Sequence, residues 1–132
     1  MYPSQTIVVS IRCPWRQVYE FLAEPLNLPT WVSYLDGIAH VRDNDWRSET
    51  EDGPVTLRFT PRNQHGVLDL GVMREGVPAM TLPARVSPNG DDGAELVCTL
   101  FHSPDSTDDE FRSETAWIEA DLMALKSLLE AA

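Results

Sequence analysis

Short stretches in which apolar and polar residues alternate fill most of the middle of the chain, and helical patterns lie on either side of them. The clearest alternation is that of Val55, Leu57 and Phe59 with their polar neighbours, which predicts a half-buried strand. The short β-branched segment 6–11 predicts a first strand ahead of the helical patterns. Together these patterns predict the order β-α-α, then about six antiparallel strands, then one long helix.

Two helices are predicted directly after the first strand. Pro14 stands at a position where a helix can begin, because the first turn needs no backbone N–H there. Apolar residues then recur at helical spacing, at Trp15, Val18, Tyr19 and Leu22. Pro25 and Pro29 interrupt this pattern and leave room for only a short second helix, around residues 26–34. This second helix contains Trp31.

Turn residues divide the middle of the chain into further strands, which we expect over 37–41, 46–50, 55–60, 67–74, 78–86 and 95–102. Residues 63–66 supply one turn, and the sequence Asn-Gly-Asp-Asp-Gly at 89–93 is a strong hairpin signal. Pro83 lies inside a predicted strand and marks a bulge or a sheet edge, because proline cannot donate to a ladder of hydrogen bonds.

The C-terminal segment carries the strongest helical pattern. Thr107 and Glu110 have the spacing of a capping box, and acidic residues occupy the first turn, where the helix dipole favours them. One continuous apolar stripe follows, at Phe111, Ile118, Leu122, Leu125 and Leu129. Trp117 lies one position off this stripe, where it would cover the seam between helix and sheet or form a dimer contact.

The two hairpin turns indicate which side chains share a face of the sheet. The first turn places opposite one another residues whose numbers sum to about 152, and the second does so for residues whose numbers sum to about 182. Residues that lie opposite one another point to the same side of the sheet. The resulting apolar face contains Leu68, Leu70, Val72, Met80, Leu82, Val86, Leu96, Cys98, Leu100 and His102. Val55, Leu57 and Phe59 join it if the loop after Phe59 holds about four residues. Ile7, Val9 and Ile11 are their expected partners on the first strand.

This predicted face carries no carboxylate, lysine or arginine. Asp69 and Arg85 fall diagonally on the opposite face, where they form either a surface ion pair or a buried pair that orients a ligand. Because acid–base catalysis needs two matched groups near one substrate, the lining favours binding over catalysis.

Length and charge narrow the class of protein. The 132 residues correspond to one domain over 1–132, and the net charge of −11 disfavours nucleic acid and anionic membrane surfaces as partners. We see no signal peptide and no apolar run long enough to insert into a membrane, and we expect a cytoplasmic protein. In a reducing compartment Cys13 and Cys98 are expected to be free, although a disulfide between them remains an alternative.

Motifs for cofactors and metals are missing from the sequence. His40 and His65 form no metal-ligand pair, and no Gly-rich nucleotide loop or nucleophile elbow occurs. We therefore expect neither a metal nor a cofactor.

The order of elements and several motifs resemble the SRPBCC superfamily, which includes START lipid-transfer domains, polyketide cyclases and birch-pollen-type allergens. The opening motif is Ile11-Arg12-Cys13-Pro14, Val18-Tyr19, Phe21-Leu22-Ala23-Glu24-Pro25 and Trp31. A second set of residues looks like the pattern of an uncharacterised bacterial subgroup. These residues are Asn63, Gly66-Val67-Leu68-Asp69, Arg85-Val86, Pro88-Asn89-Gly90, Asp121-Leu122, Leu125-Lys126 and Leu128-Leu129-Glu130. The chain departs from the pattern at Cys13, where alanine is usual, at Tyr19, where tryptophan is frequent, and at Leu70, where the subgroup often has histidine.

The resemblance implies an α+β helix-grip fold, in which a curved antiparallel sheet holds the C-terminal helix and a cavity lies between them. With the face assignment above, the expected cavity residues are Trp31, Leu57, Phe59, Leu70, Met80, Leu82, Cys98, Leu100, Ile118 and Leu122. We expect this cavity to bind a small hydrophobic or aromatic ligand, lipid-like or polyketide-like.

Two alternatives remain open. The first is a polyketide cyclase- or dehydratase-like enzyme in which His102, helped by Tyr34, transfers protons. The second is a homodimeric interaction module without a ligand, formed through the sheet edge or Trp117.

Overall fold

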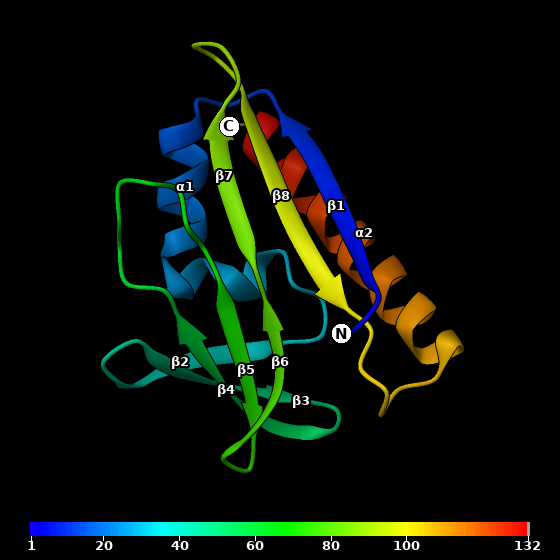
Figure 1. The fold of residues 1–132 in the computed structure, drawn as a ribbon. Helices are drawn as coiled ribbons and strands as arrows, with labels where there is room; N and C mark the ends of the chain where they lie inside the picture. The colour runs from blue at the N-terminus through cyan, green and yellow to red at the C-terminus, as the bar shows by residue number, and fades with distance from the viewer. Residues whose placement is uncertain (132) are drawn as a thin grey trace.

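The structure is a computed structural model, and it describes residues 1–131. Its elements, in chain order, are β1 (Ser4–Ile11), α1 (Trp15–Ala23), the 3₁₀ helix η1 (Pro25–Thr30), β2 (Asp36–Arg42), β3 (Asp45–Thr50), β4 (Gly53–Phe59), β5 (Leu70–Arg74), β6 (Val77–Leu82), β7 (Ala84–Pro88), β8 (Ala94–Phe101) and α2 (Asp108–Glu130). Figure 1 shows α2 running along β1 and β8, with which it forms one long wall of the molecule. The predicted order of helices and strands is confirmed.

All strand pairs are antiparallel, but they form two sheets rather than one. The first has the order β1-β8-β7 and the second the order β2-β3-β4-β5-β6. The single strand predicted over 78–86 is wrong, because it divides at Pro83 into β6 and β7, which belong to different sheets. Pro83 has no N–H to donate, and its carbonyl accepts a hydrogen bond from Thr99 N at 3.0 Å.

The predicted register is confirmed on both hairpins. Leu70 pairs with Leu82, and Val86 pairs with Leu96. On the first strand, Ile7, Val9 and Ile11 lie opposite Cys98, Leu96 and Ala94. The apolar side chains of these strands therefore do share one face.

The connection between β4 and β5 is longer than expected. Phe59 pairs with Leu70, so the apolar positions still align, but the whole segment 60–69 lies between them instead of a four-residue loop. Within it, the predicted strand residues 67–69 form only an isolated bridge between Val67 and Arg85. The side chain of Asn63 folds the segment by accepting hydrogen bonds from the N–H groups of His65 and Val67.

The second predicted helix is shorter than expected and of a different type. The sequence predicts a helix around residues 26–34, whereas the structure has a 3₁₀ helix that ends at Thr30. Pro25 begins the helix and Pro29 lies inside it, so Pro29 cannot donate a hydrogen bond that would extend an α-helix. Trp31 and Tyr34 consequently lie in the irregular segment between η1 and β2.

The long helix α2 begins as predicted. Thr107 Oγ1 accepts a hydrogen bond from Glu110 N at 3.1 Å, and the Glu110 carboxylate accepts one from Thr107 N at 3.0 Å. The predicted stripe faces the protein, with Leu122, Leu125 and Leu129 buried. Trp117 is instead 64% exposed, so the expectation that it covers the helix–sheet seam is wrong.

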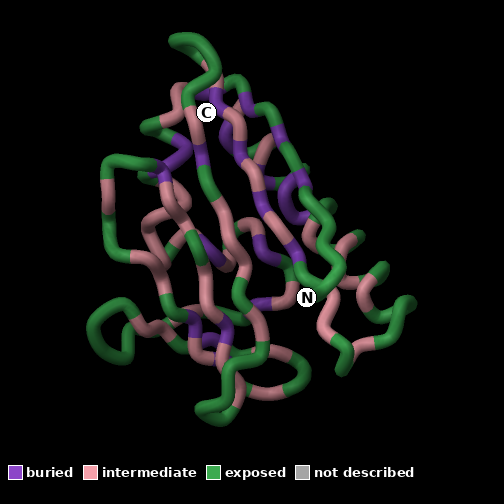
Figure 2. Tube along the Cα trace, viewed as in Figure 1, coloured by how far each residue is buried: buried purple, intermediate pink, exposed green. Residues whose placement is uncertain are grey.

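Two separate groups of buried side chains form the core. The larger joins α1, α2 and the three-stranded sheet; the smaller joins the segment 28–35 to the five-stranded sheet. Figure 2 shows buried positions in both parts of the molecule, along β1, β8 and α2 and again near the lower strands. Trp31 packs against both groups, which places it at their junction.

Candidate ligand cavity

A cavity of about 90 Å³ lies at this junction, several times the space that one buried water needs. Its walls come from α1, the segment 28–34, both sheets and α2. The lining is mostly apolar and consists of Leu22, Ala23, Leu28, Trp31, Val32, Tyr34, Phe59, Thr60, Leu68, Leu70, Met80, Leu82, Ala84, Leu96, Cys98, Ile118, Asp121 and Leu122.

The structure brings most of the expected cavity residues together. Those that line the cavity are Trp31, Phe59, Leu70, Met80, Leu82, Cys98, Ile118 and Leu122. The other two are not among the lining residues: Leu57 is buried in the smaller core and Leu100 in the larger one. The alternation of each strand identified the correct face, but it does not show how far along a strand the cavity reaches.

Asp121 adds a carboxylate that the prediction did not include. The sheet face is apolar as expected, but α2 places Asp121 against it, and this side chain is only 8% exposed. Its Oδ2 accepts one long hydrogen bond, from Ser33 N at 3.3 Å. A signal was present in the sequence, because Asp121 lies three residues after Ile118 and four before Leu125, on the apolar stripe.

Tyr34, the second residue of the predicted proton-transfer pair, lines the same cavity. Burial raises the pKa of its hydroxyl, the nearby Asp121 carboxylate raises it further, and Glu114 adds a smaller effect in the same direction. Arg74 opposes these effects. Burial likewise raises the pKa of Glu114. The Tyr34 hydroxyl therefore remains protonated at neutral pH, so it is available as a hydrogen-bond donor rather than as a base.

The remaining polar atoms of the lining are not activated for chemistry. Burial raises the pKa of the Cys98 thiol to about 11, so it is a poor nucleophile. Cys98 and Cys13 are both buried free thiols. Trp31 Nε1 is shielded from solvent and has no hydrogen-bond partner among the described residues.

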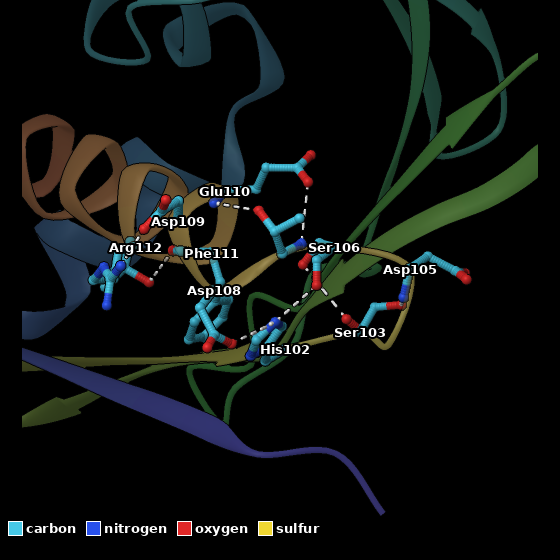
Figure 3. A network of polar contacts seen from close by, with 11 residues as sticks. His102, Ser103, Asp105, Ser106, Asp108, Asp109, Glu110, Phe111 and Arg112 are labelled. Carbon is cyan, nitrogen blue, oxygen red and sulfur yellow. Dashed lines mark hydrogen bonds and ion pairs between the residues drawn. The ribbon is translucent and has the colours of Figure 1, made fainter.

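His102 does not line the cavity. The strand β8 ends at Phe101, and the chain turns away immediately afterwards. Figure 3 shows the His102 side chain beside the loop that leads into α2, where its Nε2 lies 3.0 Å from Ser106 O and 3.8 Å from Asp108 Oδ1. Its ring stacks on Phe111 with the centroids 4.6 Å apart. The expected partnership of His102 with Tyr34 therefore has no geometric basis.

The expected pair of Asp69 and Arg85 is also wrong in both of its forms. Asp69 Oδ1 accepts a hydrogen bond from Ala84 N at 3.0 Å, and Arg85 Nε donates to His65 O at 3.2 Å. Each side chain thus binds backbone of a neighbouring segment, and the two hold the segment 60–69 against β7.

Within residues 1–131, no group of three or more His, Cys, Asp or Glu side chains could hold a metal ion. No helix of the described chain is long and apolar enough to cross a membrane.

The fold is the helix grip of SRPBCC and START-like proteins: mixed α+β, with antiparallel sheets around a long C-terminal helix. Similar solved structures include a START superfamily protein from Mycobacterium smegmatis (TM-score 0.76, 13% identity, 97% of each chain covered). Another is the aromatase/cyclase Zhui from Streptomyces sp. R1128 (TM-score 0.74, 15% identity, covering 99% of this chain and 93% of that one).

An uncharacterised protein from Bacillus thuringiensis is similar too (TM-score 0.78, 16% identity, covering 96% of this chain and 98% of that one). At such identities the likeness establishes the fold and leaves the activity open. No model of a known family matches the chain, and no curated protein is a significant match.

Proposed function

We propose that the protein binds a small, predominantly hydrophobic or aromatic molecule in the cavity between the sheets and α2. The observation that carries this proposal is the cavity itself, a space of about 90 Å³ with a largely apolar lining that the protein's own side chains leave unfilled. Unfilled apolar space weakens packing, so a ligand that occupies it would restore contacts and stabilise the folded state. The similarity of the fold to START superfamily and aromatase/cyclase structures supports the same proposal.

Binding is favoured over a cyclase- or dehydratase-like activity because His102, the residue expected to transfer protons, is not among the lining residues of the cavity. The Cys98 thiol and the Tyr34 hydroxyl are both protonated at neutral pH, since burial raises the pKa of each. His102 lies outside the lining, where its Nε2 contacts Ser106 O and its ring stacks on Phe111.

We also propose a cytoplasmic location for the protein. Cys13 and Cys98 are both free and buried, which suits a reducing compartment.

The proposal is tested with prodan, a neutral naphthalene dye whose emission shifts to the blue in apolar surroundings. Wild-type protein should bind it, and Leu70→Trp should weaken binding by at least about tenfold, because the indole would fill the cavity. Met80→Trp provides a second wall variant from a different strand, in case the first does not fold.

The matched control is Leu128→Trp, the same exchange at a partly exposed position of α2 that does not line the cavity. It should leave the affinity for prodan unchanged. The absence of prodan binding to the wild-type protein, or equal losses in the wall and control variants, would contradict the proposal.

A further inference from the structure

We infer that the cavity prefers apolar molecules that carry a protonated amine, with the ammonium group bound by the carboxylate of Asp121. This inference rests on the proposed function, because it concerns the polar end of a ligand in the same cavity. It follows from the charge that α2 places in an otherwise apolar lining.

Asp121 is a buried carboxylate with spare acceptor capacity. A carboxylate can accept about four hydrogen bonds, and Asp121 receives one long bond, from Ser33 N to Oδ2 at 3.3 Å. Its Oδ1 has no hydrogen-bond partner within residues 1–131 and is not shut off from open space in the way that Trp31 Nε1 is. One carboxylate oxygen is thus available to a ligand.

Within residues 1–131, no cationic side chain forms an ion pair with this carboxylate. None of the ion pairs among the described residues includes Asp121, and the lining contains no lysine, arginine or histidine. The charge of Arg74 lowers the pKa of the neighbouring Tyr34, but Arg74 is not among the lining residues and forms no ion pair with Asp121. Because a buried charge without a partner is unfavourable, a cationic ligand gains what the protein itself does not provide.

The surroundings of Asp121 favour a cation over a neutral hydrogen-bond donor. The charge of Asp121 acts on Tyr34 more strongly than the charges of Arg74 and Glu114, which oppose each other, so Asp121 is the main source of negative potential at this end of the cavity. The aromatic side chains Trp31, Tyr34 and Phe59 line the same space and can stabilise an ammonium group through their ring faces. An alcohol would satisfy the oxygen but leave the charge uncompensated, and an anionic ligand would be repelled.

The test uses three probes with the same aromatic body: phenethylamine, 2-phenylethanol and phenylacetate. Each competes with prodan at neutral pH and low salt. We expect wild-type protein to bind phenethylamine at least about tenfold more tightly than 2-phenylethanol, and phenylacetate more weakly than either. In Asp121→Asn, which keeps an acceptor for Ser33 N, the preference for the amine over the alcohol should fall to about threefold or less.

Asp92→Asn is the matched control, because it removes the same charge from an exposed hairpin position. It should keep the full preference, which separates the effect of Asp121 from the attraction of a cation to a protein of net charge −11. If Asp121→Asn does not fold, Asp121→Ser tests the same loss of charge with a smaller side chain.

The outcomes distinguish this inference from the proposed function. If prodan binds and Leu70→Trp excludes it, but the amine has no advantage over the alcohol or keeps its advantage in Asp121→Asn, the inference is wrong and the proposed function stands. If prodan does not bind to the wild-type protein, the proposed function fails and the inference fails with it.

Discussion

At the scale of single residues, burial sets the protonation state of the polar groups around the cavity. Cys98 is 3% exposed and lies at the centre of a sheet, opposite Ile7 and Ala84. Burial at this position removes most of the solvent that would stabilise the thiolate, so the thiol keeps its proton to higher pH. The same physics keeps Tyr34 protonated, although there the carboxylate of Asp121 contributes as well.

The raised pKa of Cys98 predicts a loss of stability in alkali. In the folded protein the thiol titrates at about 11, against an ordinary value of 9.0. Between these values the unfolded chain has lost the proton and the folded chain has kept it, so rising pH favours unfolding. The free energy of unfolding should therefore be unaffected by this group below pH ~8 and fall by about 2–3 kcal/mol between pH ~9 and ~11.

The measurement is urea denaturation at a series of pH values, compared with Cys98→Ala. The variant should be less stable at neutral pH, because alanine leaves a smaller side chain beside the cavity, but its stability should fall less steeply above pH ~9. Parallel curves for the two proteins would show that Cys98 does not cause the loss.

At the scale of elements, the capping box stabilises the N-terminus of the helix α2. The first four N–H groups of a helix have no partner within it, and the capping box satisfies two of them through Thr107 and Glu110. Asp108 and Asp109 stand in the same turn, where the helix dipole favours negative charge. The helix in turn carries Ile118, Asp121 and Leu122 into the cavity wall, so its start fixes their positions.

We expect Thr107→Ala to reduce the free energy of unfolding by about 1 kcal/mol, because the side chain that accepts from Glu110 N is removed. Thr107→Asp, which retains a cap, should stay within about 0.5 kcal/mol of the wild-type protein. Chemical denaturation of the three proteins measures the difference. Equal losses in both variants would assign the effect to some other contact of Thr107.

At the scale of the whole molecule, the two sheets are joined by more than the passage from β6 to β7. The segment 60–69 leaves the five-stranded sheet after Phe59 and packs against the three-stranded one, where Gly66 O accepts a hydrogen bond from Val86 N at 2.9 Å. Asn63 N donates to the hydroxyl of Tyr19 at 2.7 Å, which ties the same segment to α1. Because the cavity lies between the sheets, we expect these contacts to help hold its walls in place.

Gly66 is required at this contact. Its φ of +73° disfavours any other residue, and a Cβ there would lie 2.0 Å from Val86 O, which belongs to a strand and cannot move freely. We expect Gly66→Ala to cost about 3 kcal/mol or more in unfolding free energy. Gly90→Ala is the matched control: it has a similar φ of +69° but open space around it, and should cost only about 1 kcal/mol. Similar losses in both would mean that backbone strain, rather than the contact with Val86, dominates.

The order of elements, the parity of the strands and the capping box were predictable because they depend on local chemistry. Alternation places Leu70 and Leu82 on one face whatever the rest of the chain does, and the number of residues after Phe59 could be misjudged without changing that face. Thr107 and Glu110 interact within one helical turn, so three residues of sequence suffice to recognise them.

Contacts between segments that are distant in the sequence could not be predicted from local patterns. Pro83 disrupts a strand in any context, but only the packing of β6 and β7 assigns its two sides to different sheets. His102 follows the apolar alternation of β8, yet the strand ends one residue earlier and the ring stacks on Phe111. Asp121 reaches the cavity because α2 crosses the sheet at that turn, and the position of one element on another depends on side-chain packing that no local pattern contains.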